Sequence, residues 1–258
     1  MDEWHDILPC LLNKRLVWSS QCSQLYCEIA ARCIQYARWK KKGLVQVAKQ
    51  GDADGVKYLV EKCGADVHAD NEEALRFASL YGHLEVVRCL VEKGGADVHA
   101  LNEDALRWAS TFGQLAIVKY LVEECGANVH TWQEDALRAA SKNGHLEVVK
   151  YLVERCEADV HAWDEESLRW ASEKGHVQLV KYLVENGADV HAGNDDALRW
   201  ASEFGQLSMV KYLVLECGAD VHARDYSGYD ALQLARENGH LEVVEYLKSK
   251  GAVFVEEE

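Results

Sequence analysis

Six histidines recur at nearly constant spacing, and histidine is the commonest metal ligand among protein side chains. They are His68, His99, His130, His161, His191 and His222, so the steps between them are 31, 31, 31, 30 and 31 residues. Zinc needs its ligands about 2.0–2.1 Å from one ion, and histidines that stand one structural unit apart cannot converge that closely. We therefore predict that these side chains bond neighbouring loop backbone and that they hold no metal.

Nine cysteines could also carry chemistry, and four of them share one position relative to the histidines: Cys63, Cys125, Cys156 and Cys217. Equivalent positions of stacked helical units lie about 8–10 Å apart, whereas a disulfide needs Cα atoms within about 7 Å. We expect free thiols in a reducing compartment.

The sequence contains no Gly-rich phosphate loop, no nucleophile elbow and no His-Glu-x-x-His motif. The remaining regularly placed histidines belong to a repeated Gly-His position, as at His83 and His145. A catalytic group should stand out as a departure from the repeat, and none does. We predict no catalytic residue, no cofactor and no enzyme activity.

The formal net charge of −15 disfavours binding to nucleic acids, because such binding depends on Lys and Arg neutralising phosphates. A basic run at residues 38–42 fits either a nuclear-localisation signal or the solvated end of a helix. No window approaches the ~20 apolar residues of a membrane span, and the start has no secretory signal. We expect a monomeric cytoplasmic protein that contacts neither nucleic acid nor membrane.

The period of the histidines indicates a repeating pair of short helices. In residues 70–100, Asn71 and the acids after it are expected to cap a first helix, which Gly82 ends. A second helix begins at Leu84, and its apolar residues form a stripe at helical spacing. Each unit is too small to bury its apolar face alone and must stack on its neighbours.

Over residues 43–251 these units resemble the ankyrin repeat family, as in Gly-His-Leu-Glu-Val-Val at 144–149 and Gly-Ala-Asp-Val at 187–190. The resemblance implies an all-α ankyrin solenoid in residues 43–258, built of about seven helix-turn-helix units that bind a partner protein. The units would start near residues 43, 70, 101, 132, 163, 193 and 224. They are most similar to the short-repeat ankyrin proteins of large DNA viruses of amoebae, which would place the protein in a host cytoplasm with a host partner.

The units depart from the family in length. In the last unit, Ala231 follows Ala223 by eight residues, whereas in an inner unit the equivalent Ala74 follows Ala69 by five. The inner units therefore lack three residues of the family's β-hairpin finger, and most gain one residue before Ala-Asp-Val. We expect shortened fingers in every unit but the last.

Each position of the unit forms a column along the stack. For the arginine column, Arg76, Arg107, Arg138, Arg169 and Arg199, we predict ion pairs between repeats, with an anion-binding stripe as the alternative. Phe77, Trp108, Trp170 and Trp200 share a position where the family usually has leucine. We predict that these four rings fill the core.

The resemblance places partner contacts on the concave face, at the two residues before the glycine that ends each first helix, and at the finger tips. The matching residues that we predict to bind are Leu80, Tyr81, Leu101, Phe112, Trp132, Lys142, Trp163, Lys174 and Phe204. Aromatic residues dominate interface hot spots, and the exposed aromatics gather in the first half of the array. The alternative is that they fold back over the stack because the fingers are short.

Residues 1–42 do not fit the repeat, and we expect them to form a helical capping segment that shields the first unit. A zinc site is the alternative for their cysteines, but Cys22 and Cys27 would lie ~140° apart around a helix. A second alternative is an F-box-like adaptor that links a bound target to ubiquitin-ligase machinery. Its only hint is the start Ile7-Leu8-Pro9.

Overall fold

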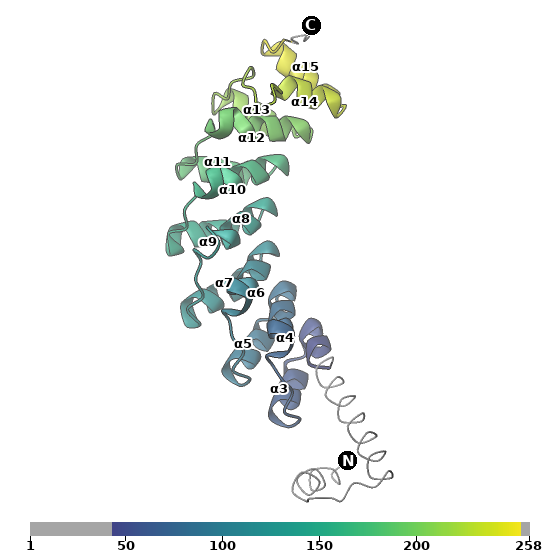
Figure 1. Ribbon diagram of the computed structural model, residues 1–258, viewed down its shortest axis with the longest axis vertical. Coiled ribbons are helices and arrows are strands. Elements are labelled where there is room, and N and C mark those ends of the chain that lie inside the picture. The colour runs from purple at the N-terminus through teal and green to yellow at the C-terminus, as the bar shows by residue number, and fades with distance from the viewer. Residues whose placement is uncertain (1–42, 254–258) are drawn as a thin grey trace, which may run out of the picture.

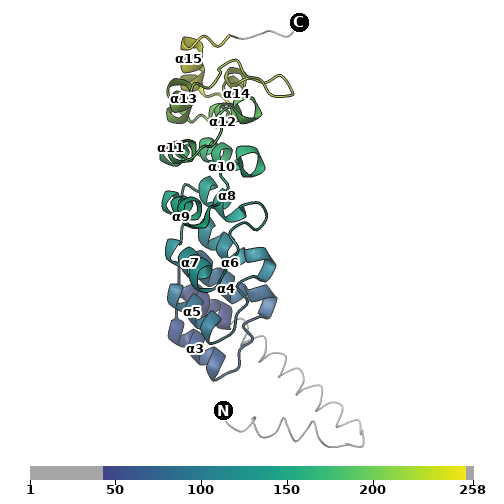
Figure 2. The same ribbon diagram turned by 90° about the vertical axis from the view of Figure 1, so that its left-hand side faces the viewer.

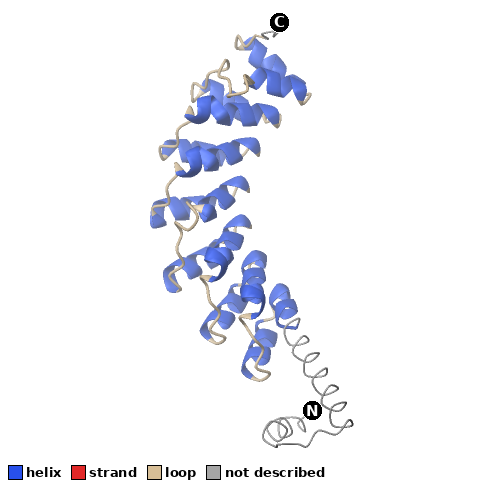
Figure 3. Ribbon diagram, in the orientation of Figure 1, coloured by secondary structure: helices blue, strands red, loops and turns tan. Residues whose placement is uncertain are grey.

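The computed structural model describes residues 43–253, which form paired helices stacked into a long, bowed array (Figure 1). These residues contain no strand (Figure 3), and their one β-type pairing is an isolated antiparallel bridge between Arg224 and Asp230. The predicted all-α repeat solenoid is confirmed. The predicted helical cap of residues 1–42 lies outside the described residues.

Each unit places a first helix on the inner side of the bow and a second helix on the outer side (Figure 1). The first helices are residues 43–50, α4 (Ala69–Tyr81), α6 (Ala100–Thr111), α8 (Asp135–Lys142), α10 (Ala162–Glu173), α12 (Ala192–Glu203) and α14 (Ala231–Glu237). The second helices are α3 (Ala53–Glu61), α5 (Leu84–Glu92), α7 (Leu115–Lys119) continued by the π-helical η2 (Tyr120–Glu124), α9 (Leu146–Cys156), α11 (Val177–Glu185), α13 (Leu207–Leu215) and α15 (Leu241–Ser249).

One apolar core runs between the two layers of helices along the described part of the array. In the third unit, for example, Leu106 of α6 and Leu121 of η2 are both almost completely buried. Burial of one such leucine stabilises the fold by roughly 1.5–3 kcal/mol. Because each unit completes its core with side chains of the next, the units stabilise one another.

The glycine that ends each first helix has a role in stacking as well as in turning the chain. Gly113 has φ +70°, and a Cβ there would come 2.5 Å from Nδ1 of His145. The same imidazole donates from Nε2 to the carbonyl oxygen of Thr111, at 2.9 Å. The Gly-His position is therefore an inter-repeat tie, in which glycine provides both the left-handed turn and the space for the ring.

The extra residue of the 31-residue units is absorbed at the end of the second helix. There a backbone bond reaches five residues back, as from Cys125 N to Tyr120 O at 3.2 Å and from Cys217 N to Tyr212 O at 3.3 Å. The unit with the 30-residue step closes α11 normally, with Asn186 N donating to Tyr182 O at 3.1 Å. The π-type closure explains why the period exceeds 30 without disturbing the stack.

The shortened fingers are three-residue left-handed turns at the tip side of each inner unit. In the fifth unit, Trp163, Asp164 and Glu165 have φ values of 55°, 53° and 63°. Asn71, at φ 54°, lies inside such a turn, and no side chain caps α4. The predicted capping role of Asn71 is therefore wrong, because the shortened connection has to reverse the chain within these residues.

A left-handed backbone costs an L-residue roughly 1–2 kcal/mol, and the arginine column offsets that cost. Arg138 donates from Nη2 to Trp132 O and from Nε to Gln133 O, both at 3.1 Å, and it pairs with Glu166 of the next unit. The predicted ion pairs between repeats are confirmed, for example Arg76 with Asp104 and Arg169 with Asp196, both at 3.1 Å. The bonds to the turn carbonyls were not predicted.

The turn and the arginine occur together along the chain. The last unit keeps its full finger, bridged at Arg224 and Asp230, and has Gln233 in the arginine position. Arg107 differs from the other four arginines in its partners, because it pairs with the carboxylates of Asp104 and Asp135. In that unit, Glu103 accepts a hydrogen bond from Asn128 N at 3.1 Å.

We predict that Arg138→Lys lowers the free energy of unfolding by about 2 kcal/mol, because an ammonium cannot reproduce the guanidinium's several bonds to the turn carbonyls and to carboxylates. Urea denaturation followed by circular dichroism measures the change. Arg155→Lys, at an exposed position of α9, is the matched control and should change stability by less than about 0.5 kcal/mol. Equal losses of stability at the two sites would contradict the proposed role of Arg138 in holding the turn.

Candidate partner-binding surface

The residues that we predicted to bind lie along the inner helices and at the tips of the left-handed turns. Six of them are exposed apolar side chains: Trp132 (67%), Trp163 (53%), Tyr81 (50%), Leu101 (50%), Phe112 (46%) and Phe204 (44%). Lys174 is also exposed, whereas Leu80 and Lys142 are half-buried. These six side chains are thus about half exposed, with the rest of each surface covered by the array.

The exposed rings of the inner helices rest on a second row of rings. Tyr81 stacks on Phe77 with centroids 6.2 Å apart, and Phe112 stacks on Trp108 at 5.9 Å. Phe204 stacks in the same way on a tryptophan four residues earlier, at 6.3 Å. Because residues four apart share one helix face, each pair forms a rigid aromatic patch.

This second row corrects the prediction that Phe77, Trp108, Trp170 and Trp200 fill the core, since all four are half-buried. The leucine two residues earlier takes the core position, as Leu106 does for Trp108. Trp108 instead faces its own helix surface, where its indole N–H donates to Asp104 Oδ2 at 2.9 Å. These rings belong to the inner surface, which sequence reasoning missed because the family's leucine in that position suggested burial.

Cations stand over several of these rings. Lys142 Nζ lies 4.4 Å from the centroid of Trp170, and Lys174 Nζ lies 5.7 Å from that of Phe204. The Arg138 guanidinium lies 5.2 Å from the ring of Trp163. Cation–π contacts at exposed sites contribute about 0.5–1 kcal/mol each, so they hold rings and cations in place from one unit to the next.

The turn geometry fixes the tip residues. Trp132 and Trp163 are each the first residue of a left-handed turn. Arg138 holds the carbonyl of Trp132 at 3.1 Å, and Arg169 holds that of Trp163 at 2.9 Å. The backbone beneath both indoles is thus tied to the first helix that follows it.

A histidine–carboxylate pair closes each turn from its other end. His99 Nδ1 lies 2.7 Å from Glu103 Oε1, and the other distances are 2.6 Å for His68–Glu72, 2.6 Å for His130–Glu134, 2.5 Å for His161–Glu165 and 2.8 Å for His191–Asp195. The hydrogen bond to the carboxylate raises the pKa of His68, His99 and His161. The predicted bonds from these rings to loop backbone are therefore wrong for these five, whose ring partner is the acid four residues on.

Comparison with known proteins identifies the fold. The family model of ankyrin repeats matches residues 44–132, 125–194 and 192–257. The chain belongs to the ankyrin repeat family. It is similar to the crystal structure of the human ASB11 ankyrin repeat domain, with 26% sequence identity and a TM-score of 0.68, over 82% of this chain and 99% of that chain. No curated protein matches the sequence.

One exposed aromatic residue of the last ankyrin unit was not among the residues that we predicted to bind a partner. Tyr226 lies in the full-length finger before α14 and is fully exposed. In Figure 2 this longer loop projects sideways near α14. The longer interval from Ala223 to Ala231 could have identified it, because that interval marks a unit with a full-length finger.

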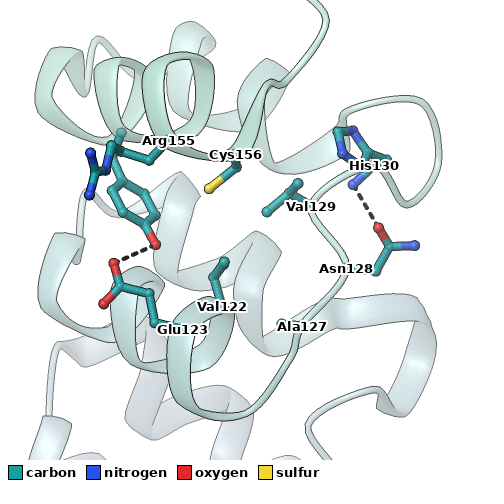
Figure 4. A pocket seen from close by; sticks show the side chains of 9 residues that line it. Val122, Glu123, Ala127, Asn128, Val129, His130, Arg155 and Cys156 are labelled. Atoms are coloured by element: carbon teal, nitrogen blue, oxygen red, sulfur yellow. Dashed lines mark hydrogen bonds between the residues drawn. The ribbon is translucent and has the colours of Figure 1, made fainter.

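An open hollow of about 540 Å³ lies between the third and fourth ankyrin units (Figure 4). Val122, Val129 and Cys156 line it, and Tyr151 donates to Glu123 at 3.0 Å beside them. Burial raises the pKa of the Cys156 thiol, which opposes formation of a reactive thiolate. Cys63, Cys89, Cys125, Cys156 and Cys217 are not joined in disulfides, as predicted for the four that share a position.

Residues 43–253 contain no group of three or more His, Cys, Asp or Glu side chains arranged to hold a metal ion. Within the same residues, no helix is both long enough and apolar enough to cross a membrane.

The His99–Glu103 pair predicts a pH-dependent stability. Because the carboxylate raises the pKa of His99 above its ordinary value of 6.5, the pair stabilises the fold fully below pH 6.5 and loses that effect as the pH rises through the raised pKa. The loss of unfolding free energy caused by His99→Gln should therefore be larger at pH 6 than at pH 9, as measured by urea denaturation. In a Glu103→Gln background the same substitution should lose its pH dependence; an unchanged dependence would show that another group is responsible.

Proposed function

We propose that this protein is a non-catalytic scaffold that binds a partner protein through the inner face and turn tips of its ankyrin array. Ankyrin repeats generally mediate protein–protein interaction, and the fold is a typical interaction scaffold without catalysis. The observation that carries the proposal is the band of exposed aromatic side chains along one side of the array, from Tyr81 to Phe204.

Preorganisation supports this surface as the binding site. Rings that are already stacked, as Phe112 is on Trp108, lose little side-chain entropy when a partner covers them. The turns that carry Trp132 and Trp163 are held by arginine bonds. Interface hot spots are enriched in tryptophan and tyrosine, and this side of the array presents both, as at Trp132 and Tyr81.

The finer parts of the proposal remain predictions. They are the likeness to ankyrin proteins of large DNA viruses, a host protein as partner, a location in the cytoplasm and a monomeric state. The ubiquitin-ligase adaptor depends on residues 1–42, which lie outside the described residues. If it is right, a chain lacking residues 1–42 should still bind its target but should no longer recruit a ligase component; aggregation of that chain would instead support the capping role.

The binding surface is tested by the double substitution Phe112→Ala and Trp132→Ala. Each ring is exposed, so we expect the thermal midpoint to move by less than about 2 °C, whereas partner binding should weaken at least about tenfold because truncating a hot spot costs more than 1 kcal/mol. Affinity capture from cytosol, with quantification by mass spectrometry, identifies the partner, and titration of that partner measures the change.

The matched control is Tyr58→Ala with Leu215→Ala, which removes equally exposed side chains from the outer helices α3 and α13. The control should retain the partner. A partner lost from both variants, or from neither, would contradict an inner-face site. A large fall in stability of the inner-face variant would show that its residues pack rather than bind.

A further inference from the structure

The tip-side loops carry most of the net charge of the chain. These loops, called here the acidic edge, are residues 66–72, 97–103, 128–134, 159–165, 189–195 and 220–226. They contain thirteen Asp and Glu residues, no lysine and one arginine, Arg224, which makes −12 of the formal −15. The remaining residues of the chain are therefore close to neutral, and the charge is concentrated along one side of the solenoid.

Burial divides these acids into two groups. The five that pair with the histidines of the turns are buried, as Glu103 and Glu165 are. The others stand at the surface, and seven of them are exposed: Asp66, Asp70, Asp97, Asp159, Asp164, Asp189 and Asp220. The exposed carboxylates recur once or twice in most units, so a ligand lying along the edge meets negative charge at regular intervals.

The same loops present the most exposed apolar side chains of this side. Leu101, Trp132, Trp163 and Tyr226 all lie within the acidic edge and are at least half exposed. The arginines behind the edge do not neutralise it, because they bond the turn carbonyls and carboxylates of the helices, as Arg169 does with Trp163 O and Asp196. Exposed apolar side chains and exposed carboxylates are thus neighbours in the same set of loops.

We propose that the partner segment that docks on the acidic edge is a basic peptide, in which lysines and arginines alternate with aromatic or large aliphatic residues. The apolar residues pack on the tip side chains, and the basic residues pair with the exposed carboxylates between them. Complementary charge raises the association rate and rejects acidic competitors. The inference rests on the proposed function and specifies the chemistry of its partner.

The chain itself shows how to remove the charge without disturbing the fold. In five units the aspartate two residues before the histidine accepts the histidine's backbone N–H, as Asp97 does from His99 at 2.9 Å. In the fourth unit the same position is Asn128, which accepts from His130 N at 3.0 Å. An asparagine therefore keeps the loop and loses only the charge.

To identify the class of peptide that binds, random 16-residue peptides displayed on phage are selected against the full chain at low ionic strength. We expect the enriched peptides to carry net positive charge together with aromatic or aliphatic residues. The most enriched peptide is then synthesised, along with a copy in which every Lys and Arg is replaced by Gln. Enriched peptides that are neutral or acidic would overturn the proposal.

The decisive variant is Asp97→Asn, Asp159→Asn and Asp189→Asn in one chain. It should bind the enriched peptide about tenfold more weakly at low ionic strength, with a smaller difference at 0.5 M salt, because screening weakens exposed charge pairs. The control Glu85→Gln, Glu216→Gln and Glu245→Gln removes three exposed acids elsewhere and should change affinity less than about twofold. Equal effects of the two variants would overturn the proposal.

The two proposals can fail separately. Peptides that lose binding with Phe112→Ala and Trp132→Ala but carry no basic residues would leave the scaffold function intact and refute the basic partner. Basic peptides that bind equally well to the Phe112→Ala, Trp132→Ala chain would refute the proposed aromatic surface instead.

Discussion

The three-residue left-handed turn is the element on which the geometry of the inner ankyrin units depends. Trp132, Gln133 and Glu134 all have positive φ, at a cost of roughly 3–6 kcal/mol for the turn as a whole. Arg138 binds two of its carbonyls, and His130 pairs with the buried carboxylate of Glu134. Charge-assisted hydrogen bonds of this kind contribute about 1.5–3 kcal/mol each, which is enough to offset the strain.

The arginines that bind the turn carbonyls also help to position the surface that we propose binds the partner. The arginine that binds the carbonyl of a tip tryptophan reaches an acid of the following unit, as Arg169 reaches Asp196. The position of each tip is therefore set by two neighbouring units. A surface assembled in this way is stiff, and stiffness is what lets exposed rings bind without a large loss of entropy. Removal of one such arginine should therefore alter the position of the adjacent tip residue and also lower the free energy of unfolding.

Much of the ankyrin architecture could be predicted from the sequence, because it depends on residues with one strong conformational or packing preference. Gly82 ends its helix, the core leucines recur at helical spacing, and the extra residue before Ala-Asp-Val is visible in the period. The left-handed turns could not be predicted, since Trp132 and Leu101 have no preference for positive φ. The half-burial of Trp108 was missed for a similar reason: residue type indicated burial, but the position of Leu106 two residues earlier decided which side chain reached the core.

The informative positions of the array are those that vary while the fold around them stays constant. Asn128 and Asp97 make the same bond to a histidine N–H, so the backbone does not select between them, and the choice changes only the charge of the edge. Gly193 and Trp163 begin equivalent turns, yet one presents no side chain and the other an exposed indole. Since structure tolerates either residue at these positions, the pattern of charge and aromatic surface along the edge is free to be set by the partner, and that pattern is acidic, aromatic and concentrated on one side.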